Sequence, residues 1–96
     1  MATFDVALFG EMMVLLVAAE PGPLEQVHTF HKMTAGAETN VGIALARLGA
    51  KVAWASRLGD DTMGMYLKNI MQQEAVDCSR VLMVPRERTG FMLKGK

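Results

Sequence analysis

The spacing of the apolar residues changes once along this chain, and that change constrains the fold more than any other feature. Residues 26–33 alternate between two faces, as they do on a half-exposed strand. The apolar residues that follow recur at helical spacing and form one predicted buried stripe: Val41, Ala44, Leu45 and Leu48. Gly49 can end this helix, and a short link then leads to a buried strand predicted over Val52–Ser56. A helix joined so closely to a strand predicts a layered α/β unit.

The other segments extend this pattern. Strands are predicted at residues 5–9, 13–18, 80–84 and 89–94. A second helix is predicted from the Asp60-Asp61 cap to about Glu74. Its apolar stripe consists of Met63, Tyr66, Leu67, Ile70 and Met71. This order predicts a sheet with parallel crossovers and a small antiparallel flap built from the early and late strands. Because two helices cannot cover both faces of a parallel sheet, the architecture is predicted to be unfinished as it stands.

Charge and hydropathy argue against several classes of partner. Ten basic and ten acidic residues give no net charge and no basic stripe, so we expect no nucleic acid partner. The longest apolar run, Met12 to Ala19, is too short to cross a bilayer and lacks the features of a secretory leader. We therefore expect a cytoplasmic protein with no membrane partner. Cys78 is the only cysteine, so no internal disulfide can form.

Several segments together carry a family resemblance. Residues 35–49 read Ala-Gly-Ala-Glu-Thr-Asn-Val-Gly-Ile-Ala-Leu-Ala-Arg-Leu-Gly, and residues 57–61 read Arg-Leu-Gly-Asp-Asp, with Gly64 three positions later. They resemble the first signature of the ribokinase-like (PfkB) carbohydrate kinases. Phe9-Gly10-Glu11 and Thr89-Gly90-Phe91-Met92 also resemble their counterparts in that family. The Gly-Ala-Glu-x-Asn loop and the Pro-Gly-Pro-Leu segment are most similar to those of the 2-keto-3-deoxygluconate kinases.

The resemblance implies a fold and an activity. The fold is α/β, the amino-terminal part of a ribokinase-like three-layer αβα sandwich with a small β-sheet lid. Residues 1–96 would be an amino-terminal fragment of one kinase domain, with lid strands around 13–33 and 80–96. The intact enzyme would use ATP and Mg²⁺ to phosphorylate a small sugar or sugar acid such as 2-keto-3-deoxygluconate. A homodimer formed through the lid strands is also implied.

The same resemblance implies a substrate-binding segment: Gly36, Ala37, Glu38, Thr39 and Asn40, with Phe91 and Met92 of the flap against the sugar. The chemistry of the loop agrees, because small residues leave room for a ligand and a helix start presents unpaired amides that suit a sugar acid. Asn40 offers a donor and acceptors for hydroxyl groups, and Glu38 offers acceptors only. From the residues alone, the favoured interpretation is structural: Gly36 makes a tight turn, and Thr39 or Asn40 caps the helix.

No catalytic residue and no metal ligand is assigned to this chain. The family places its glycine-rich anion hole and its catalytic aspartate in a later signature, beyond residue 96, and no Gly-x4-Gly-Lys-Ser/Thr loop replaces them. Asp60 and Asp61 are adjacent at a helix start, where caps are commoner than metal pairs. His28 and His31 would face opposite sides of their predicted strand. The 96-residue chain alone is therefore predicted to be inactive.

Three interpretations remain open at this point. The chain is part of a sugar kinase, or it is a non-catalytic sugar-binding or dimerisation module of the same fold, or it is an unrelated nucleotide-binding α/β domain. The last is disfavoured because no Gly-x-Gly-x-x-Gly turn follows Phe9. Within the first interpretation, a fructokinase or a ribokinase is the alternative to a sugar-acid kinase.

Overall fold

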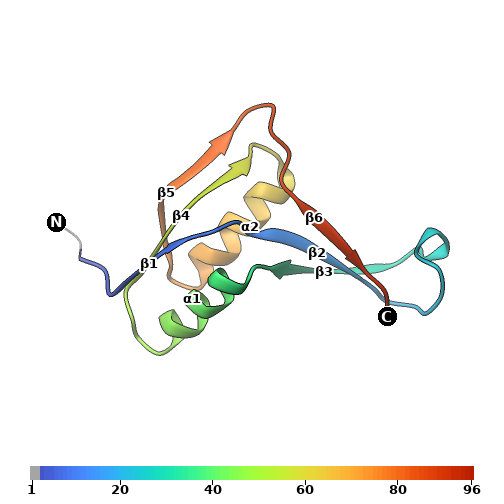
Figure 1. The fold of residues 1–96 in the computed structure, drawn as a ribbon, viewed down its shortest axis with the longest axis horizontal. Coiled ribbons are helices and arrows are strands. Elements are labelled where there is room, and N and C mark those ends of the chain that lie inside the picture. The colour runs from blue at the N-terminus through green and yellow to red at the C-terminus, as the bar shows by residue number, and fades with distance from the viewer. Residues whose placement is uncertain (1–2) are drawn as a thin grey trace.

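A computed structural model describes residues 3–96, which form two three-stranded sheets and two helices. The first sheet has the order β1 (Val6–Phe9), β4 (Val52–Gly59), β5 (Asp77–Val84), and all its strands are parallel. The second sheet, called the lid sheet below, has the order β3 (Phe30–Ala35), β2 (Met13–Ala18), β6 (Phe91–Lys94). Figure 1 shows the lid sheet extending to one side of the parallel sheet.

The helices α1 (Ala37–Arg47) and α2 (Thr62–Gln73) pack on the same face of the parallel sheet. That face carries the core, in which Trp54 of β4 and Leu67 of α2 are completely buried. The opposite face of the sheet is bare, since Phe9 of β1 is 76% exposed and Leu82 of β5 is 63% exposed. The described residues therefore leave one face of the parallel sheet uncovered, as predicted.

Helix α2 agrees with the prediction from its sequence. It begins after Asp61, whose side chain caps it by accepting a hydrogen bond of 2.7 Å from the Gly64 amide. The predicted stripe faces the core, with two of its residues buried and the other three packed against the core cluster: Leu67, Met71, Met63, Tyr66 and Ile70.

Helix α1 departs from the prediction at its start. Its N-cap is Gly36, so Thr39 and Asn40 lie in the first turn, and the prediction that either one caps the helix is wrong. The reason is the turn at Gly36, whose φ of 151° ends β3 and lets the helix begin at the next residue.

The predicted apolar stripe of α1 is mostly wrong, because Val41 is 56% exposed and Leu48 is 84% exposed, whereas Leu45 does pack against the core. Thr39 and Gly42 are the buried positions of this helix. A β-carbon on Gly42 would overlap the Leu8 side chain, so it is the glycine that brings this face of α1 close to the sheet.

The lid sheet differs from the prediction in two ways. The third strand begins at Phe30 rather than near Gln26, because Leu24–Gln26 form a 3₁₀ turn and the Glu20 carboxylate accepts hydrogen bonds from the amides of His28 and Thr29. Strand β6 runs parallel to β2, whereas β3 is antiparallel to it, so the lid sheet is mixed and the predicted antiparallel flap is only half correct. Two parallel strands need a long connection, and the chain between β2 and β6 provides it with β3, α1, β4, α2 and β5.

Candidate functional site

Within residues 3–96 the chain passes between the lid sheet and the rest of the molecule three times, and a glycine lies at each crossing (Figure 1). Gly10 separates β1 from β2, Gly36 separates β3 from α1, and Gly90 lies between β5 and β6. Gly10 follows the carboxyl end of β1. In open α/β sheets, ligands bind at the carboxyl ends of the parallel strands. The crossings therefore mark the edge of the sheet at which a ligand is expected.

The Gly36 crossing is tightly built. A β-carbon on Gly36 would lie 2.6 Å from the Thr39 hydroxyl oxygen and 3.1 Å from the Glu11 carbonyl oxygen. The Gly36 carbonyl accepts hydrogen bonds of 3.0 Å from both the Asn40 amide and the Thr39 hydroxyl. The first turn of α1 thus begins with its free amides directed toward the crossing, where they can meet an anion or a hydroxyl group.

The predicted substrate-binding residues of this loop divide into two groups. Ala37, Glu38 and Asn40 are exposed and can meet a ligand. Thr39 is completely buried and its hydroxyl is bound to the Gly36 carbonyl, so its contribution is to shape the loop.

Two carboxylates border the same region. A β-carbon on Gly10 would lie 3.5 Å from the Glu38 carboxylate oxygen Oε2, and one on Gly90 would lie 3.6 Å from Oε1 of Glu11. Glu38 thus covers the Gly10 crossing, and Glu11 reaches the Gly90 crossing. Sequence reasoning gave Glu11 no role, although the Phe9-Gly10-Glu11 segment was part of the resemblance. Carboxylate oxygens at this edge can accept hydrogen bonds from sugar hydroxyls.

Phe91 and Met92, the two predicted contacts from the lid, point to opposite faces of the lid sheet. Phe91 pairs with Val14 of β2, and Met92 pairs with Leu15, so their side chains alternate. Val14 is completely buried, which places Phe91 on the lid face that meets the core. Met92 shares its face with Leu15 and with Met33 of β3. One face of the lid can therefore present only one of the two side chains to a ligand.

The Gly90 crossing is held by a partly buried hydrogen-bond cluster that sequence reasoning missed. Asp61 accepts hydrogen bonds from the Thr89 amide at 2.9 Å and from the Thr89 hydroxyl at 2.8 Å, besides capping α2. Hydrogen bonds to the carboxylate hold the pKa of Asp61 below its usual value. The largest effect comes from the Thr89 amide, and the Gly64 amide and the Thr89 hydroxyl follow in that order. The signal available in the sequence was only that both residues belong to segments quoted for the family.

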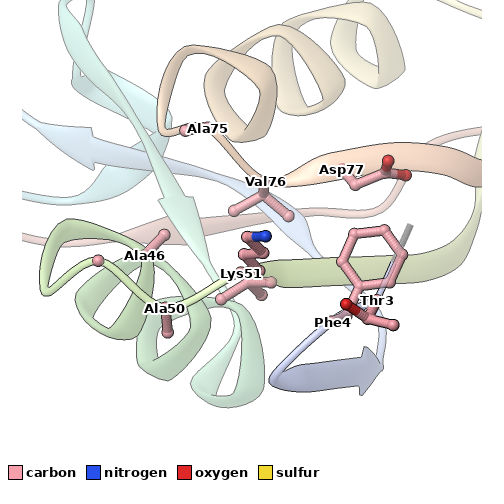
Figure 2. A pocket seen from close by; sticks show the side chains of 10 residues that line it. Thr3, Phe4, Ala46, Ala50, Lys51, Ala75, Val76 and Asp77 are labelled. Carbon is pink, nitrogen blue, oxygen red and sulfur yellow. The ribbon is translucent and has the colours of Figure 1, made fainter. Parts of the chain in front are cut away.

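A cavity of about 760 Å³ lies at the other end of the parallel sheet (Figure 2). This cavity is open and offers few polar groups to a ligand. Lys51 and Asp77 are the charged residues of its described lining, and the Asp77 carboxylate already accepts hydrogen bonds from the amide and hydroxyl of Ser79. None of the predicted site residues lines it. We place the candidate site at the glycine crossings and not in this cavity, because the crossings combine free helix amides with exposed polar side chains.

Two further findings concern metals and membranes. Among residues 3–96, no group of three or more His, Cys, Asp or Glu side chains is arranged to hold a metal ion. No helix in this part of the chain is long and apolar enough to span a membrane.

Comparison with known proteins gives the class of the chain. Residues 3–94 match the pfkB family of carbohydrate kinases. The chain belongs to this family, and its α/β architecture is the ribokinase-like fold of its structural neighbours.

Individual relatives refine this result. The 2-dehydro-3-deoxygluconokinase of Bacillus subtilis (strain 168) is 44% identical over 93 residues, which cover 96% of this chain and 29% of that protein. The probable fructokinase-2 of Arabidopsis thaliana is 41% identical over 73 residues, which cover 75% of this chain and 22% of that protein. Relatives with different named substrates therefore match the same segment.

Solved structures agree with the fold. The PfkB protein of Polaromonas sp. JS666 superimposes with a TM-score of 0.95 and 61% identity, covering 98% of this chain and 32% of that one. The uncharacterized sugar kinase PH1459 of Pyrococcus horikoshii, in complex with ATP, superimposes with a TM-score of 0.85 and 33% identity over 92% of this chain and 29% of that one. The chain spans less than a third of the length of each of these proteins.

Proposed function

We propose that this chain is the amino-terminal, sugar-binding part of an ATP-dependent kinase that phosphorylates a sugar acid such as 2-keto-3-deoxygluconate. The observation that carries the proposal is the Gly36–Asn40 loop, in which a helix start and exposed polar side chains meet at the carboxyl end of β1. The similarity to the Bacillus subtilis enzyme supports this substrate class. The similarity to a fructokinase keeps a neutral sugar as the alternative substrate.

The charges around the loop indicate how a sugar acid would lie. The amides of the first turn of α1 carry partial positive charge and suit the carboxylate of the sugar. Glu38 and Glu11 repel that carboxylate and accept hydrogen bonds only, so they suit the hydroxyl groups. Asn40 is exposed beside the amides and can bind either end. A sugar acid would therefore be oriented with its carboxylate toward α1 and its hydroxyls toward the acidic side chains.

The phosphate donor is proposed by family membership and not from these residues. Phosphoryl transfer requires groups that hold the phosphates, Mg²⁺ and a base. The described residues offer neither a glycine-rich phosphate loop nor an acidic cluster for a metal, so they do not fit ATP or Mg²⁺. We accordingly propose no step through either group, and we expect the 96-residue chain to show no ATP-dependent phosphorylation by itself. Measurable turnover by that chain would contradict this expectation.

We further propose that the lid sheet forms a homodimer and that the protein is cytoplasmic. Strands β3 and β6 are the edges of the lid sheet, and unpaired edges favour association with another strand. Four apolar side chains of these strands are exposed: Met33, Phe91, Met92 and Leu93. Cys78 is buried and unpaired, which suits a reducing compartment.

The substrate proposal is tested with the protein that carries this chain. With 2-keto-3-deoxygluconate as substrate, Asn40→Ala should raise the sugar KM by about tenfold, which corresponds to the loss of one or two hydrogen bonds, and should leave the KM for ATP unchanged. Asn69→Ala is the matched control, because Asn69 is an exposed asparagine on α2. An unchanged sugar KM would remove Asn40 from the site, and preferential turnover of fructose would favour the fructokinase alternative.

A further inference from the structure

The Asp61 carboxylate makes more hydrogen bonds than a helix cap needs. Its oxygen Oδ1 accepts from the Gly64 amide at 2.7 Å, which is the capping bond of α2. The same oxygen accepts from the Thr89 hydroxyl at 2.8 Å, and Oδ2 accepts from the Thr89 amide at 2.9 Å. Thr89 is 28 residues away in sequence. One side chain therefore ties the start of α2 to the segment that enters the lid sheet.

Thr89 has little freedom to move. It is only 7% exposed, and its hydroxyl also accepts a hydrogen bond of 3.1 Å from the Gly59 amide. A β-carbon on Gly59 would lie 2.5 Å from the Glu87 carbonyl oxygen and 2.6 Å from the Thr89 nitrogen, so the two backbone segments are in direct contact. The end of β4, the cap of α2 and Thr89 thus form one packed unit.

This unit determines where β6 begins. The carbonyl of Gly90, the next residue, accepts a hydrogen bond of 3.1 Å from the Val14 amide, and β6 then pairs with β2 from Phe91 onward. Gly90 also lies against the side chains of Met13 and Glu11. A shift of Thr89 would therefore move both the entry of β6 and the position of Glu11 at the candidate site.

We propose that Asp61 is a positioning residue for sugar binding, which holds Thr89 so that β6 and Gly90 keep a fixed place beside the Gly36–Asn40 loop. The inference rests on the proposed function, because it takes these segments to be the walls of the sugar site. Asp61 does not touch the sugar and acts through Thr89. A cap alone would be served equally well by serine or asparagine, neither of which can make all the hydrogen bonds to Thr89 that the carboxylate makes.

The test separates the cap from the tie to Thr89. In Asp61→Asn the side-chain amide still offers one oxygen to its neighbours, but its NH₂ group faces a donor, so at least one hydrogen bond is lost. Thr89→Val removes the hydroxyl and leaves the capping bond to Gly64 intact, whereas Thr89→Ser keeps the hydroxyl. Asp77→Asn is the matched control, because the Asp77 carboxylate also accepts from one residue's amide and hydroxyl, at the opposite end of β5.

Steady-state kinetics of the protein that carries this chain give the first readout. Asp61→Asn and Thr89→Val should each raise the sugar KM by about tenfold, with the KM for ATP within about twofold of wild type. Thr89→Ser and Asp77→Asn should behave as wild type. An unchanged sugar KM in both of the first two variants would overturn the proposal. So would a parallel rise in both KM values, which would indicate a general loss of structure.

Hydrogen exchange gives a second readout that needs no activity. In the protein that carries this chain, Asp61→Asn should speed exchange of the β6 amides by about tenfold relative to Asp77→Asn, while the amides in the middle of α2 keep their protection. If wild type phosphorylates no sugar, the proposed function fails, and this measurement still decides whether Asp61 holds β6. Unchanged protection of the β6 amides would contradict the proposal that Asp61 holds β6 in place through Thr89.

Discussion

The indole Nε1 of Trp54 donates a hydrogen bond of 3.1 Å to the carbonyl oxygen of Gly10. Trp54 is completely buried in the middle of β4, and Gly10 is the crossing from the parallel sheet to the lid sheet. The three crossings share this arrangement. Trp54 holds Gly10, Thr39 holds Gly36, and Asp61 holds the segment beside Gly90. A side chain from the body of the molecule thus fixes each place where the chain enters or leaves the lid.

Trp54→Phe tests the first of these contacts. Phenylalanine keeps an aromatic ring in the core but cannot donate to the Gly10 carbonyl, so we expect the free energy of unfolding to fall by about 1–3 kcal/mol from the lost hydrogen bond and the smaller ring. Urea unfolding followed by circular dichroism measures the change. Equal stability of the two proteins would mean that the hydrogen bond to Gly10 makes no net contribution to the free energy of unfolding.

Gly64→Ala tests the packing at the start of α2. A β-carbon there would overlap the Gly59 carbonyl oxygen and lie 2.9 Å from the Thr89 hydroxyl oxygen, so backbone has to move. We expect a loss of about 1–3 kcal/mol in unfolding free energy, even though alanine is a better helix former than glycine.

Gly95→Ala is the control for this substitution, because nothing lies within 4 Å of a β-carbon at that position. It should leave the unfolding free energy nearly unchanged. A Gly64→Ala protein as stable as the control would mean that the contact between α2 and the end of β4 is loose.

The sequence predicted the parts of the fold that depend on local pattern. The stripe of α2 is correct because its apolar residues recur at helical spacing and face the core, with Leu67 and Met71 completely buried. The predicted stripe of α1 is mostly wrong because glycine carries no apolar signal, and yet Gly42 is the residue of α1 that meets Leu8. The pattern predicted that Leu48 would be in the core, but Leu48 lies on the exposed side of the helix.

The sequence predicted which segment forms the candidate site, but it did not predict the contacts that position this segment. The Gly36–Asn40 loop was predicted from its family resemblance, and the residues alone predicted a helix start near it but placed the cap at Thr39 or Asn40 and not at Gly36. The Asp61 and Thr89 pair was not predicted, since the two residues are 28 positions apart and neither forms a local pattern with the other. The parallel pairing of β6 with β2 was missed for the same reason: its partner is distant in sequence.

The pH dependence of the unfolding free energy should reveal how much the ionised Asp61 carboxylate stabilises the fold. Its pKa is lowered from the usual 3.8, chiefly by the Thr89 amide, so the folded state favours the ionised carboxylate. This contribution is fully present above the unfolded pKa and is lost as the pH falls through the lower folded pKa. The difference in unfolding free energy between wild type and Asp61→Asn should therefore be constant above about pH 5 and shrink on acidification.

Urea unfolding at a series of pH values measures this difference. The pKa values of Glu74 and Asp77 are also lowered, mainly by the side chains of Arg47 and Ser79 respectively. Both carboxylates are present in wild type and variant, so their acid-side effects cancel in the difference. A difference that stays constant down to pH 2 would contradict a lowered pKa at Asp61.

Gly36→Ala tests the crossing at the centre of the candidate site. Gly36 has a φ of 151°, which alanine adopts only under strain, and its β-carbon would lie 2.6 Å from the Thr39 hydroxyl and 3.1 Å from the Glu11 carbonyl oxygen. Gly22→Ala is the matched control, because Gly22 also has a positive φ, of 116°, but nothing lies within 4 Å of a β-carbon there. Its cost in unfolding free energy reports backbone strain alone, about 1–3 kcal/mol. We expect Gly36→Ala to cost more than the control and to weaken sugar binding measured by calorimetry, because the helix amides are displaced together with the loop. Equal costs for the two substitutions, with sugar binding unchanged, would mean that the loop can rearrange without disturbing the first turn of α1.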